Sequence, residues 1–244
     1  MDIQGKVTII TGASTGIGRA TARLFAEKGA IVVLAARSAA KLEEIAQELR
    51  SQGKEALAVP TDVTQEDAVR QLVAKTIEKY GRVDILINNA GMGSAGPIVN
   101  YPADSYRQLI DLNIMGPFFG MKAVAPFMRE NGGGIIINIS SSSTRRMYPL
   151  VGAYTSTKHA LNSLSAFERE ELAPDNIRVI LMHPDYTLSD FSNNSMVYGF
   201  EPGAGAIPSP SAPKGEYPNG DMPEDVAEKI LEAALNEPAE QFMR

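Results

Sequence analysis

Six short apolar runs alternate with amphipathic stretches along the 244-residue chain. The runs are almost wholly apolar, which is typical of strands buried on both faces of a parallel sheet. We expect strands at residues 6–11, 30–35, 55–59, 84–88, 134–139 and 177–182, and helices at 16–28, 39–52, 65–80, 103–130, 152–172 and 223–236. This alternation predicts an α/β fold of the Rossmann type: a doubly wound parallel sheet with helices on both faces, forming a single domain over residues 1–244.

Three local signals refine these elements. Thr64 followed by Asp67 predicts a capping box at the start of the third helix. Asn113 lies inside the long fourth helix, and because asparagine is a poor interior helix former, it predicts a local irregularity or a bound water there. The chain stops soon after the last helix, and we expect no strand at that end.

The pattern breaks between residues 184 and 222, which are rich in proline and glycine. A loop of this length in a compact domain is usually a functional lid or disordered. Disordered linkers tend to lack aromatic residues. The segment carries five of them, which favours a substrate lid: Tyr186, Phe191, Tyr198, Phe200 and Tyr217.

Composition and charge exclude several classes of function. A net charge of −6 argues against a nucleic-acid partner. The absence of cysteine excludes disulfides, thiolate zinc sites and cysteine nucleophiles. No cluster of histidines and carboxylates has metal-ligand spacing, so we expect no metal. The chain opens without a leader-like segment and has no apolar run long enough for a bilayer, so we expect a soluble cytoplasmic protein without a membrane partner.

Three glycines, Gly12, Gly16 and Gly18, lie between the first strand and the first helix. Glycines at this place let the backbone approach a pyrophosphate, which the helix N-terminus attracts. The spacing is GxxxGxG rather than GxGxxG, and a plain tight turn is the alternative. Its position after the first strand of a βαβ unit favours dinucleotide binding.

The end of the second strand indicates which dinucleotide is bound. An NAD site usually places an acid here to bind the ribose 2′-hydroxyl. No acid occurs between Glu27 and Glu43, and Arg37 followed by Ser38 stands at the strand end. A guanidinium suits a 2′-phosphate. We therefore expect NADP(H) rather than NAD(H), with Arg37 as a merely solvated residue being the alternative, and Lys41 as a further candidate.

Tyr154 and Lys158 are four residues apart, so they share one face of the helix at 152–172. A free tyrosine titrates near pH ~10. A neighbouring ammonium favours the phenolate, so we expect Lys158 to lower the pKa of Tyr154 toward the range useful for proton transfer.

With "TGASTGIG" at 11–18, "NNAG" at 88–91, Asn113, a serine after the fifth strand and "YTSTK" at 154–158, the chain resembles the compact branch of the short-chain dehydrogenase/reductase family over residues 6 to about 190. The resemblance implies catalytic roles for Asn113, Ser141, Tyr154 and Lys158. It makes Tyr154 the general acid or base, Ser141 the partner of the reacting oxygen, and Lys158 a holder of the nicotinamide ribose. It also implies a proton relay through Asn113 and water to Lys158.

The same resemblance implies a set of cofactor-binding residues. Besides Tyr154 and Lys158 they are Gly12, Ser14, Thr15, Gly16, Ile17, Gly18, Arg37, Ser38, Asp62, Val63, Asn89, Ala90, Gly91, Pro184 and Thr187.

Other polar residues near these motifs have weaker claims. Ser143 is the runner-up to Ser141, because a run of four serines can shift its register, and we expect turn roles for Ser140 and Ser142. Tyr148 is expected in the pocket wall, with Met92 and Met147 making that wall apolar. Of the two histidines, His159 faces away from Tyr154, and His183 is expected to be structural.

Asp185 stands where the family has a glycine, which puts the nicotinamide contact of Thr187 in doubt.

The function these features predict is an NADP(H)-dependent oxidoreductase acting on a ketone, aldehyde or 3-oxoacyl group or on the matching alcohol. A small-molecule substrate and a homo-oligomer, dimer or tetramer, are the implied partners. A dinucleotide-binding sensor or scaffold without turnover is the alternative from another class.

Overall fold

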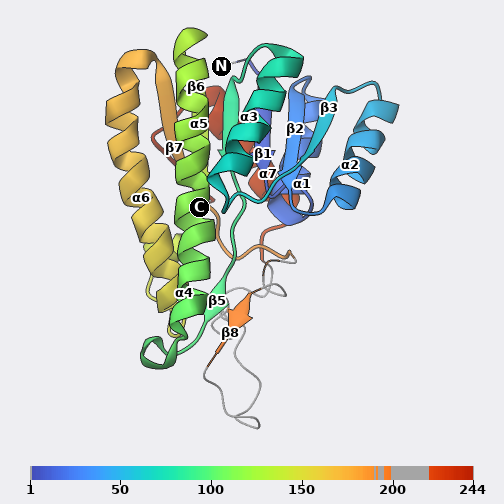
Figure 1. Ribbon diagram of the computed structural model, residues 1–244. Helices are drawn as coiled ribbons and strands as arrows, with labels where there is room; N and C mark the ends of the chain where they lie inside the picture. Colours follow the sequence, from blue (N-terminus) through green and yellow to red (C-terminus); the bar gives the residue numbers. More distant parts are fainter. Residues whose placement is uncertain (1, 190, 192–194, 199–219, 244) are drawn as a thin grey trace.

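The computed structural model describes residues 2–189, 191, 195–198 and 220–243. Its centre is one seven-stranded sheet in the order β3-β2-β1-β4-β6-β7-β9, in which every strand pairs in parallel (Figure 1). The strands are β1 (Val7–Thr11), β2 (Ile31–Ala36), β3 (Ala56–Pro60), β4 (Ile85–Asn88), β6 (Gly134–Ile139), β7 (Ile177–His183) and β9 (Glu240–Phe242). The strand order reverses between β1 and β4, which confirms the doubly wound topology.

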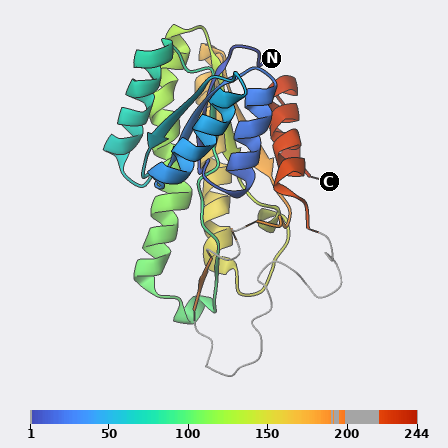
Figure 2. The ribbon, with the colours of Figure 1, turned by 90° about the vertical axis from the view of Figure 1, so that its right-hand side faces the viewer.

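Helices cover both faces of this sheet, as Figure 2 shows. One face carries α1 (Gly16–Glu27), α2 (Ala39–Ser51) and α7 (Pro223–Asn236), and the other carries α3 (Glu66–Tyr80), α5 (Gly116–Glu130) and α6 (Gly152–Leu172). Each face has its own core: Phe25 and Ile230 pack in the first, Leu72 and Val124 in the second, all fully or almost fully buried. The apolar character of the strands is explained by this double cover.

The long helix expected at residues 103–130 is interrupted. It consists of α4 (Ala103–Ile110), a π-helical turn (Asp111–Met115) and α5. The turn holds Asn113, so the irregularity predicted from this asparagine is confirmed. A π turn inside an α-helix adds a residue to the turn and often marks a functional site.

Short elements lie between the main ones. β5 (Ser94–Ala95) pairs in parallel with β8 (Met196–Val197) away from the main sheet, and both lie below it in Figure 1. Three 3₁₀ turns cover Ile98–Asn100, Ser142–Thr144 and Ala173–Asp175.

The seventh strand contradicts the expectation that no strand follows the last helix. β9 pairs with the carboxyl half of β7, with His183 opposite Phe242. Arg169 on α6 fastens this edge, because its guanidinium donates to the carbonyl oxygens of Val179 at 2.8 Å and Ala239 at 2.7 Å. Three ordinary residues thus become a strand through tertiary contacts rather than through their own propensity.

The predicted capping box at α3 is also wrong. The helix begins at Glu66, and no side-chain hydrogen bond caps it. Thr64 instead uses its amide and hydroxyl to donate to Asp62 Oδ1, at 3.0 and 2.8 Å. Thr64 is therefore part of an Asx-type turn with Asp62 before the helix and does not cap the helix.

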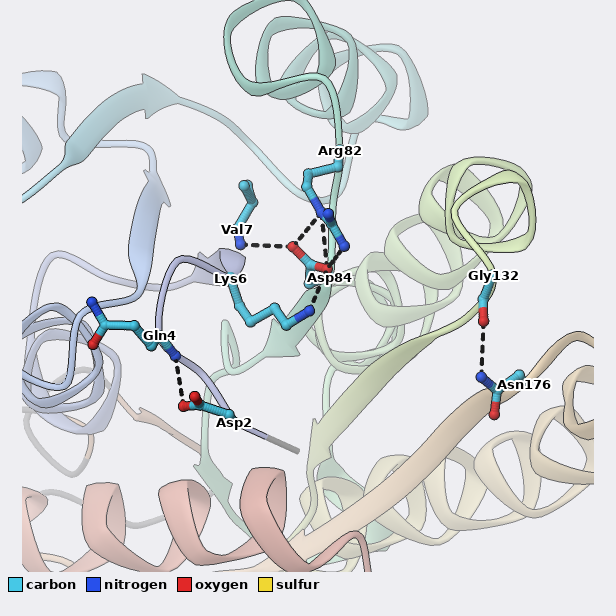
Figure 3. A network of polar contacts seen from close by, with 8 residues as sticks. All are labelled: Asp2, Gln4, Lys6, Val7, Arg82, Asp84, Gly132 and Asn176. Atoms are coloured by element: carbon cyan, nitrogen blue, oxygen red, sulfur yellow. Dashed lines mark hydrogen bonds and ion pairs between the residues drawn. The ribbon is translucent and has the colours of Figure 1, made fainter.

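The amino-terminal edge of the sheet is held by polar contacts (Figure 3). Asp84, just before β4, gathers Lys6, Val7 and Arg82 around its carboxylate. In the turns that lead into β6 and β7, Asn176 donates to the carbonyl oxygen of Gly132 at 2.8 Å. The carboxyl ends of the strands lie at the opposite edge, which is where ligands bind in open α/β sheets.

The segment 184–222 is only partly described. Residues 184–189, 191, 195–198 and 220–222 belong to the described ranges, while Phe200 and Tyr217 lie outside them. Thr187 bridges to Asp221, and the Leu188 amide donates to the Asp221 carbonyl oxygen at 2.9 Å.

Candidate active site

The glycine-rich turn joins β1 to α1 at the strand-order reversal. Gly12 and Gly16 have φ values of +67° and +51°, which side chains disfavour. A Cβ at Gly18 would lie 2.4 Å from the Gly12 carbonyl oxygen and 2.5 Å from Asn89 Nδ2, so only glycine lets α1 pack this closely. The α1 N-terminus has no acid in its first turn, and its N-cap, Thr15, makes no side-chain cap. Its free N–H groups and positive dipole end fit a pyrophosphate.

The remaining residues predicted in this turn surround the same helix start. Ser14, Thr15 and Ile17 are all partly accessible, and Ile17 also reaches the wall of the pocket described below.

The end of β2 presents an exposed cation. Arg37 and Ser38 are both exposed, and no other described residue makes a hydrogen bond or ion pair with the Arg37 side chain. Further along the same edge, Asp62 is engaged by Thr64 and Val63 is buried at 6% exposure. The Arg37 guanidinium is therefore available to an anionic group, while Asp62 already supports a turn.

The loop after β4 is tied to the end of β1. Thr11 Oγ1 accepts from the amides of Asn89 and Ala90, both at 3.0 Å, and Asn89 Nδ2 donates to the Thr11 carbonyl oxygen at 2.9 Å. Thr11 was not among the predicted site residues. A polar residue at the carboxyl end of this strand was the signal that could have identified it.

Asn113 forms hydrogen bonds with Met92, in the next part of that loop. It is fully buried. Its Oδ1 accepts from the Met92 amide at 2.9 Å, and its Nδ2 donates to the Met92 carbonyl oxygen at 2.9 Å and to Thr157 Oγ1 at 3.1 Å. A Cβ added at Gly91 would lie 3.2 Å from Asn113 Oδ1 and 3.5 Å from Lys158 Nζ. Asn113 and Lys158, the two predicted members of the relay, therefore both lie next to Gly91.

Lys158 is buried, with 5% exposure. Its Nζ donates to the Ile139 carbonyl oxygen at 2.9 Å and lies 5.9 Å from the centre of the Tyr154 ring. Removal from water disfavours the ammonium, so burial lowers the pKa of Lys158 to about 8.

Tyr154 faces the same space, from one turn earlier on α6. Burial raises its pKa to about 12, and a hydrogen bond with Ser141 acts in the lowering direction without reversing the shift. The expectation that Lys158 lowers this pKa is wrong for this structure, because desolvation of the phenolate outweighs the hydrogen bond of Ser141, the one group that acts to lower it. Helical spacing placed Tyr154 with Lys158, the family resemblance placed Ser141 with them, and all three residues line one pocket.

The four serines after β6 separate by their contacts. Ser141 Oγ accepts from the Ser143 amide at 3.2 Å. Ser140 donates its hydroxyl to Asn162 Oδ1 at 2.5 Å, so it contacts α6 rather than its own turn. The Ser143 hydroxyl is buried without a partner among the described residues. Ser141 alone of the four is tied to Tyr154.

One pocket unites these groups. Its lining includes Ser141, Tyr154 and Lys158, and Tyr148 lies in its wall as expected. Met147 is fully exposed, and neither Met92 nor Met147 lines the pocket, so the prediction that they make its wall apolar is wrong. The rest of the lining is Ile17, Asn89, Gly91, Gly93, Ser94, Ile139, Ser140, Ser142, Ser143, Val151, Pro184, Asp185, Tyr186, Thr187, Ser189, Phe191 and Ser195.

Part of the predicted lid lies against this pocket. The Phe191 ring meets the Tyr154 ring edge to face, 6.0 Å between centroids. Ser189 lies over the glycine turn, because a Cβ at Gly16 would come within 3.3 Å of it. Thr187 donates its hydroxyl to the carbonyl oxygen of Asp185 at 3.0 Å. Asp185 and Thr187 thus form one turn beside the pocket.

The described residues also bear on the expectations for a metal site, for His159 and for a membrane span. No group of three or more histidines and carboxylates there is arranged to hold a metal ion. His159 is exposed on α6. None of the described helices has both the length and the apolar character needed to cross a bilayer.

Comparison with known proteins adds independent information. The sequence model of the short chain dehydrogenases matches residues 6–196. An uncharacterized oxidoreductase of Listeria monocytogenes is 43% identical over 186 residues, which is 75% of this chain and 75% of that protein. Another, of Staphylococcus saprophyticus, is 33% identical over 98% of this chain and 93% of its own length.

The fold is also similar to those of solved enzyme structures. A 7α-hydroxysteroid dehydrogenase complexed with NADH and 7-oxo glycochenodeoxycholic acid has a TM-score of 0.83 at 31% identity, covering 95% of this chain and 88% of that one. The 3-ketoacyl-(acyl-carrier-protein) reductase of Brucella melitensis complexed with NADH has a TM-score of 0.82 at 30% identity, with 95% and 91% covered.

Proposed function

This chain belongs to the short-chain dehydrogenase family, and from that premise we propose that it is an NADP(H)-dependent oxidoreductase. It would interconvert a carbonyl group, in a ketone, aldehyde or 3-oxoacyl substrate, and the matching secondary or primary alcohol. The observation that carries the proposal is the meeting of Ser141, Tyr154 and Lys158 in one pocket at the carboxyl edge of the sheet. This edge is where α/β folds of this kind bind dinucleotides.

The dinucleotide would lie along the carboxyl edge, from the end of β2 to the pocket. The glycine turn and the α1 N-terminus would hold the pyrophosphate, since the structure keeps that helix end free of acids and caps. Arg37 and Ser38 would bind a 2′-phosphate, with Asp62 and Val63 near the adenine. Asn89, Ala90 and Gly91 would border the adenosine ribose, and Pro184 and Thr187 the nicotinamide. NAD(H) remains the alternative cofactor, since two similar structures carry NADH.

When bound, the nicotinamide supplies or accepts the hydride. In reduction, Tyr154 would give its phenolic proton to the carbonyl oxygen as the carbon gains the hydride. The Ser141 hydroxyl would donate a hydrogen bond to the same oxygen. Lys158 would stabilise the phenolate that forms and return a proton to it, with Asn113 and water completing the path to solvent.

The raised pKa of Tyr154 affects which direction of the reaction, carbonyl reduction or alcohol oxidation, is favoured at a given pH. With a pKa of about 12, Tyr154 holds its proton at neutral pH and is ready to act as an acid. Alcohol oxidation needs the phenolate instead. We therefore expect reduction to run well near pH 7 and oxidation to speed up as the pH rises.

The segment 184–222 would act as a substrate lid over this site. Phe191 already lies against Tyr154, so this ring would shape the space next to the reacting carbon. We extend the proposal to a single-domain, cytoplasmic protein that forms a homo-oligomer, dimer or tetramer. A sensor or scaffold without turnover is the competing function, and retention of Ser141, Tyr154 and Lys158 in one pocket favours the enzyme.

The test is a panel of ketones, aldehydes, 3-oxoacyl thioesters and alcohols, run with NADPH and with NADH. We expect turnover with NADPH and a kcat/KM about tenfold to 100-fold above that with NADH, equivalent to roughly 1.4–2.8 kcal/mol. Arg37→Ala should remove that preference and leave NADH turnover unchanged. Tight NADPH binding without any turnover would favour the sensor, and faster turnover with NADH would overturn the role of Arg37.

A further inference from the structure

His183 lies beside the loop that carries Ser141. It is the last residue of β7 and is buried, with 3% exposure. Its Nδ1 lies 3.4 Å from the Ser141 carbonyl oxygen. A carbonyl oxygen only accepts hydrogen bonds, so this contact requires the ring to carry a proton on Nδ1.

The peptide group that follows Ser141 is held on both of its polar atoms from the end of β7. Its carbonyl oxygen faces His183, and its N–H, which belongs to Ser142, donates to the Pro184 carbonyl oxygen at 2.9 Å. The carbonyl oxygen also accepts from the amide of Thr144 at 3.2 Å and from its hydroxyl at 2.8 Å. The Thr144 bonds stay within the turn, whereas those of His183 and Pro184 fix the turn against the sheet.

The imidazole is itself held by the C-terminal strand. The His183 and Phe242 rings stack with centroids 4.6 Å apart and an interplanar angle of 18°. The Arg145 guanidinium lies 4.3 Å from the centre of the Phe242 ring. Glu240 Oε2 is 3.5 Å from His183 Nε2, yet that nitrogen makes no hydrogen bond with any described residue. With no hydrogen bond at Nε2, the contact of Nδ1 with the Ser141 carbonyl oxygen decides the tautomer and places the proton on Nδ1.

We propose that His183, stacked on Phe242 of β9, is a positioning residue that orients Ser141 through its backbone carbonyl. The inference rests on the proposed function, in which the Ser141 hydroxyl meets the reacting oxygen. Geometry errors of about 1 Å at such a group can cost up to roughly 100-fold in rate.

Burial of the ring favours its neutral form. Burial is the largest influence and lowers the pKa of His183, with Arg145 acting in the same direction, while the Ser141 carbonyl and the Glu240 carboxylate act to raise it. The neutral imidazole is therefore the form present at and above pH 7, and it has a single proton to place.

Nitrogen NMR of the protein tests that placement without any turnover. The chain has two histidines, so a His159→Gln variant assigns both rings. At pH 8 we expect His183 to be the Nδ1–H tautomer and His159 to show the usual solvent-exposed mixture. An Nε2–H tautomer at His183 would overturn the inference whether or not the protein is an oxidoreductase.

Kinetics test the consequence with three variants. In His183→Asn the amide Nδ2 replaces Nδ1 as a donor, whereas His183→Leu has none, and His159→Leu is the matched exposed control. We expect kcat to fall about tenfold in His183→Leu and to stay within about threefold of the parent in His183→Asn, with the NADPH Kd unchanged in both. Equal losses in the Leu and Asn variants, or a loss that appears in the NADPH Kd instead, would overturn the positioning role. A parent without turnover would refute the proposed function, and the tautomer would then still decide the hydrogen bond.

Discussion

The central sheet buries one charged side chain at the amino-terminal ends of its strands and another at their carboxyl-terminal ends, and the two differ in their partners. At the amino-terminal edge Asp84 is 3% exposed, and at the carboxyl edge Lys158 is 5% exposed. Asp84 accepts from the Val7 amide at 2.9 Å and from Arg82 Nε at 2.9 and 3.0 Å, with Lys6 Nζ 3.7 Å away (Figure 3). Lys158 has one carbonyl partner, and no described carboxylate pairs with it.

This difference separates a structural charge from a reactive one. Removing an ion from water costs several kcal/mol, which partners of opposite charge and hydrogen bonds can offset. Asp84 has two cations and a backbone donor around its carboxylate, and these contacts hold β1 and β4 together. Lys158 lacks such partners, and its pKa falls to about 8, near the pH at which proton transfer has to occur.

Lys158→Met should have the largest effect among the variants that test the contrast between Asp84 and Lys158. We expect kcat to fall at least about 100-fold. Stability should rise at pH 7, because the folded-state pKa of about 8 lies below the ordinary 10.5. The cost of the buried charge is fully present below pH 8 and disappears by pH 10.5, so the stability gain, at most about 3 kcal/mol, should shrink over that range. Denaturant unfolding at several pH values measures it.

The exposed Lys75 provides the control. Lys75→Met should change neither kcat nor stability by a measurable amount. If Lys158→Met were instead destabilising at pH 7 and gave normal turnover, Lys158 would be a structural charge like Asp84.

Asp84→Ala should have the opposite outcome. It removes a buried carboxylate and leaves the Val7 amide without its acceptor, so the free energy of unfolding should fall by about 3 kcal/mol. The kcat should not change, because the pocket is at the other edge. Asp104→Ala breaks the exposed ion pair with Arg107 and should cost less than about 0.5 kcal/mol. A large loss of kcat in Asp84→Ala would mean that the two edges are coupled.

The smallest effect concerns Glu168, a half-buried carboxylate on α6. Burial, together with the nearby Glu171, raises its pKa to about 7. A raised carboxyl pKa means that the cost is present above pH 7 and fades as the pH falls toward 4.5. Glu168→Gln should therefore raise Tm at pH 8.5 by about 2 °C and show little benefit at pH 5. The exposed Glu170→Gln change should leave Tm unaltered at both pH values.

Much of the fold was predictable because its signals are local. The strands are apolar runs that alternate with amphipathic helices, and the double cover of the sheet explains both. Asn113 correctly indicated a break in its helix. β9 was not predictable, because Glu240–Phe242 is short and is made a strand by Arg169 and by the edge of β7.

The candidate site divides in the same way. Helical spacing places Tyr154 beside Lys158, and the family resemblance, counted back from Tyr154, places Ser141 with them. The sign of the pKa shift at Tyr154 was missed, because desolvation depends on the whole pocket rather than on the neighbour four residues away. Met147 was assigned to the pocket from its position in the loop, but its side chain is fully exposed.

Tyr154 provides the most direct test of the account, through the rate of NADPH oxidation with a carbonyl substrate in Tyr154→Phe. The account predicts a loss of kcat of at least about 1,000-fold, with the NADPH Kd unchanged and with Tyr148→Phe, a change at another of the pocket tyrosines, close to the parent. Full activity in Tyr154→Phe would contradict it.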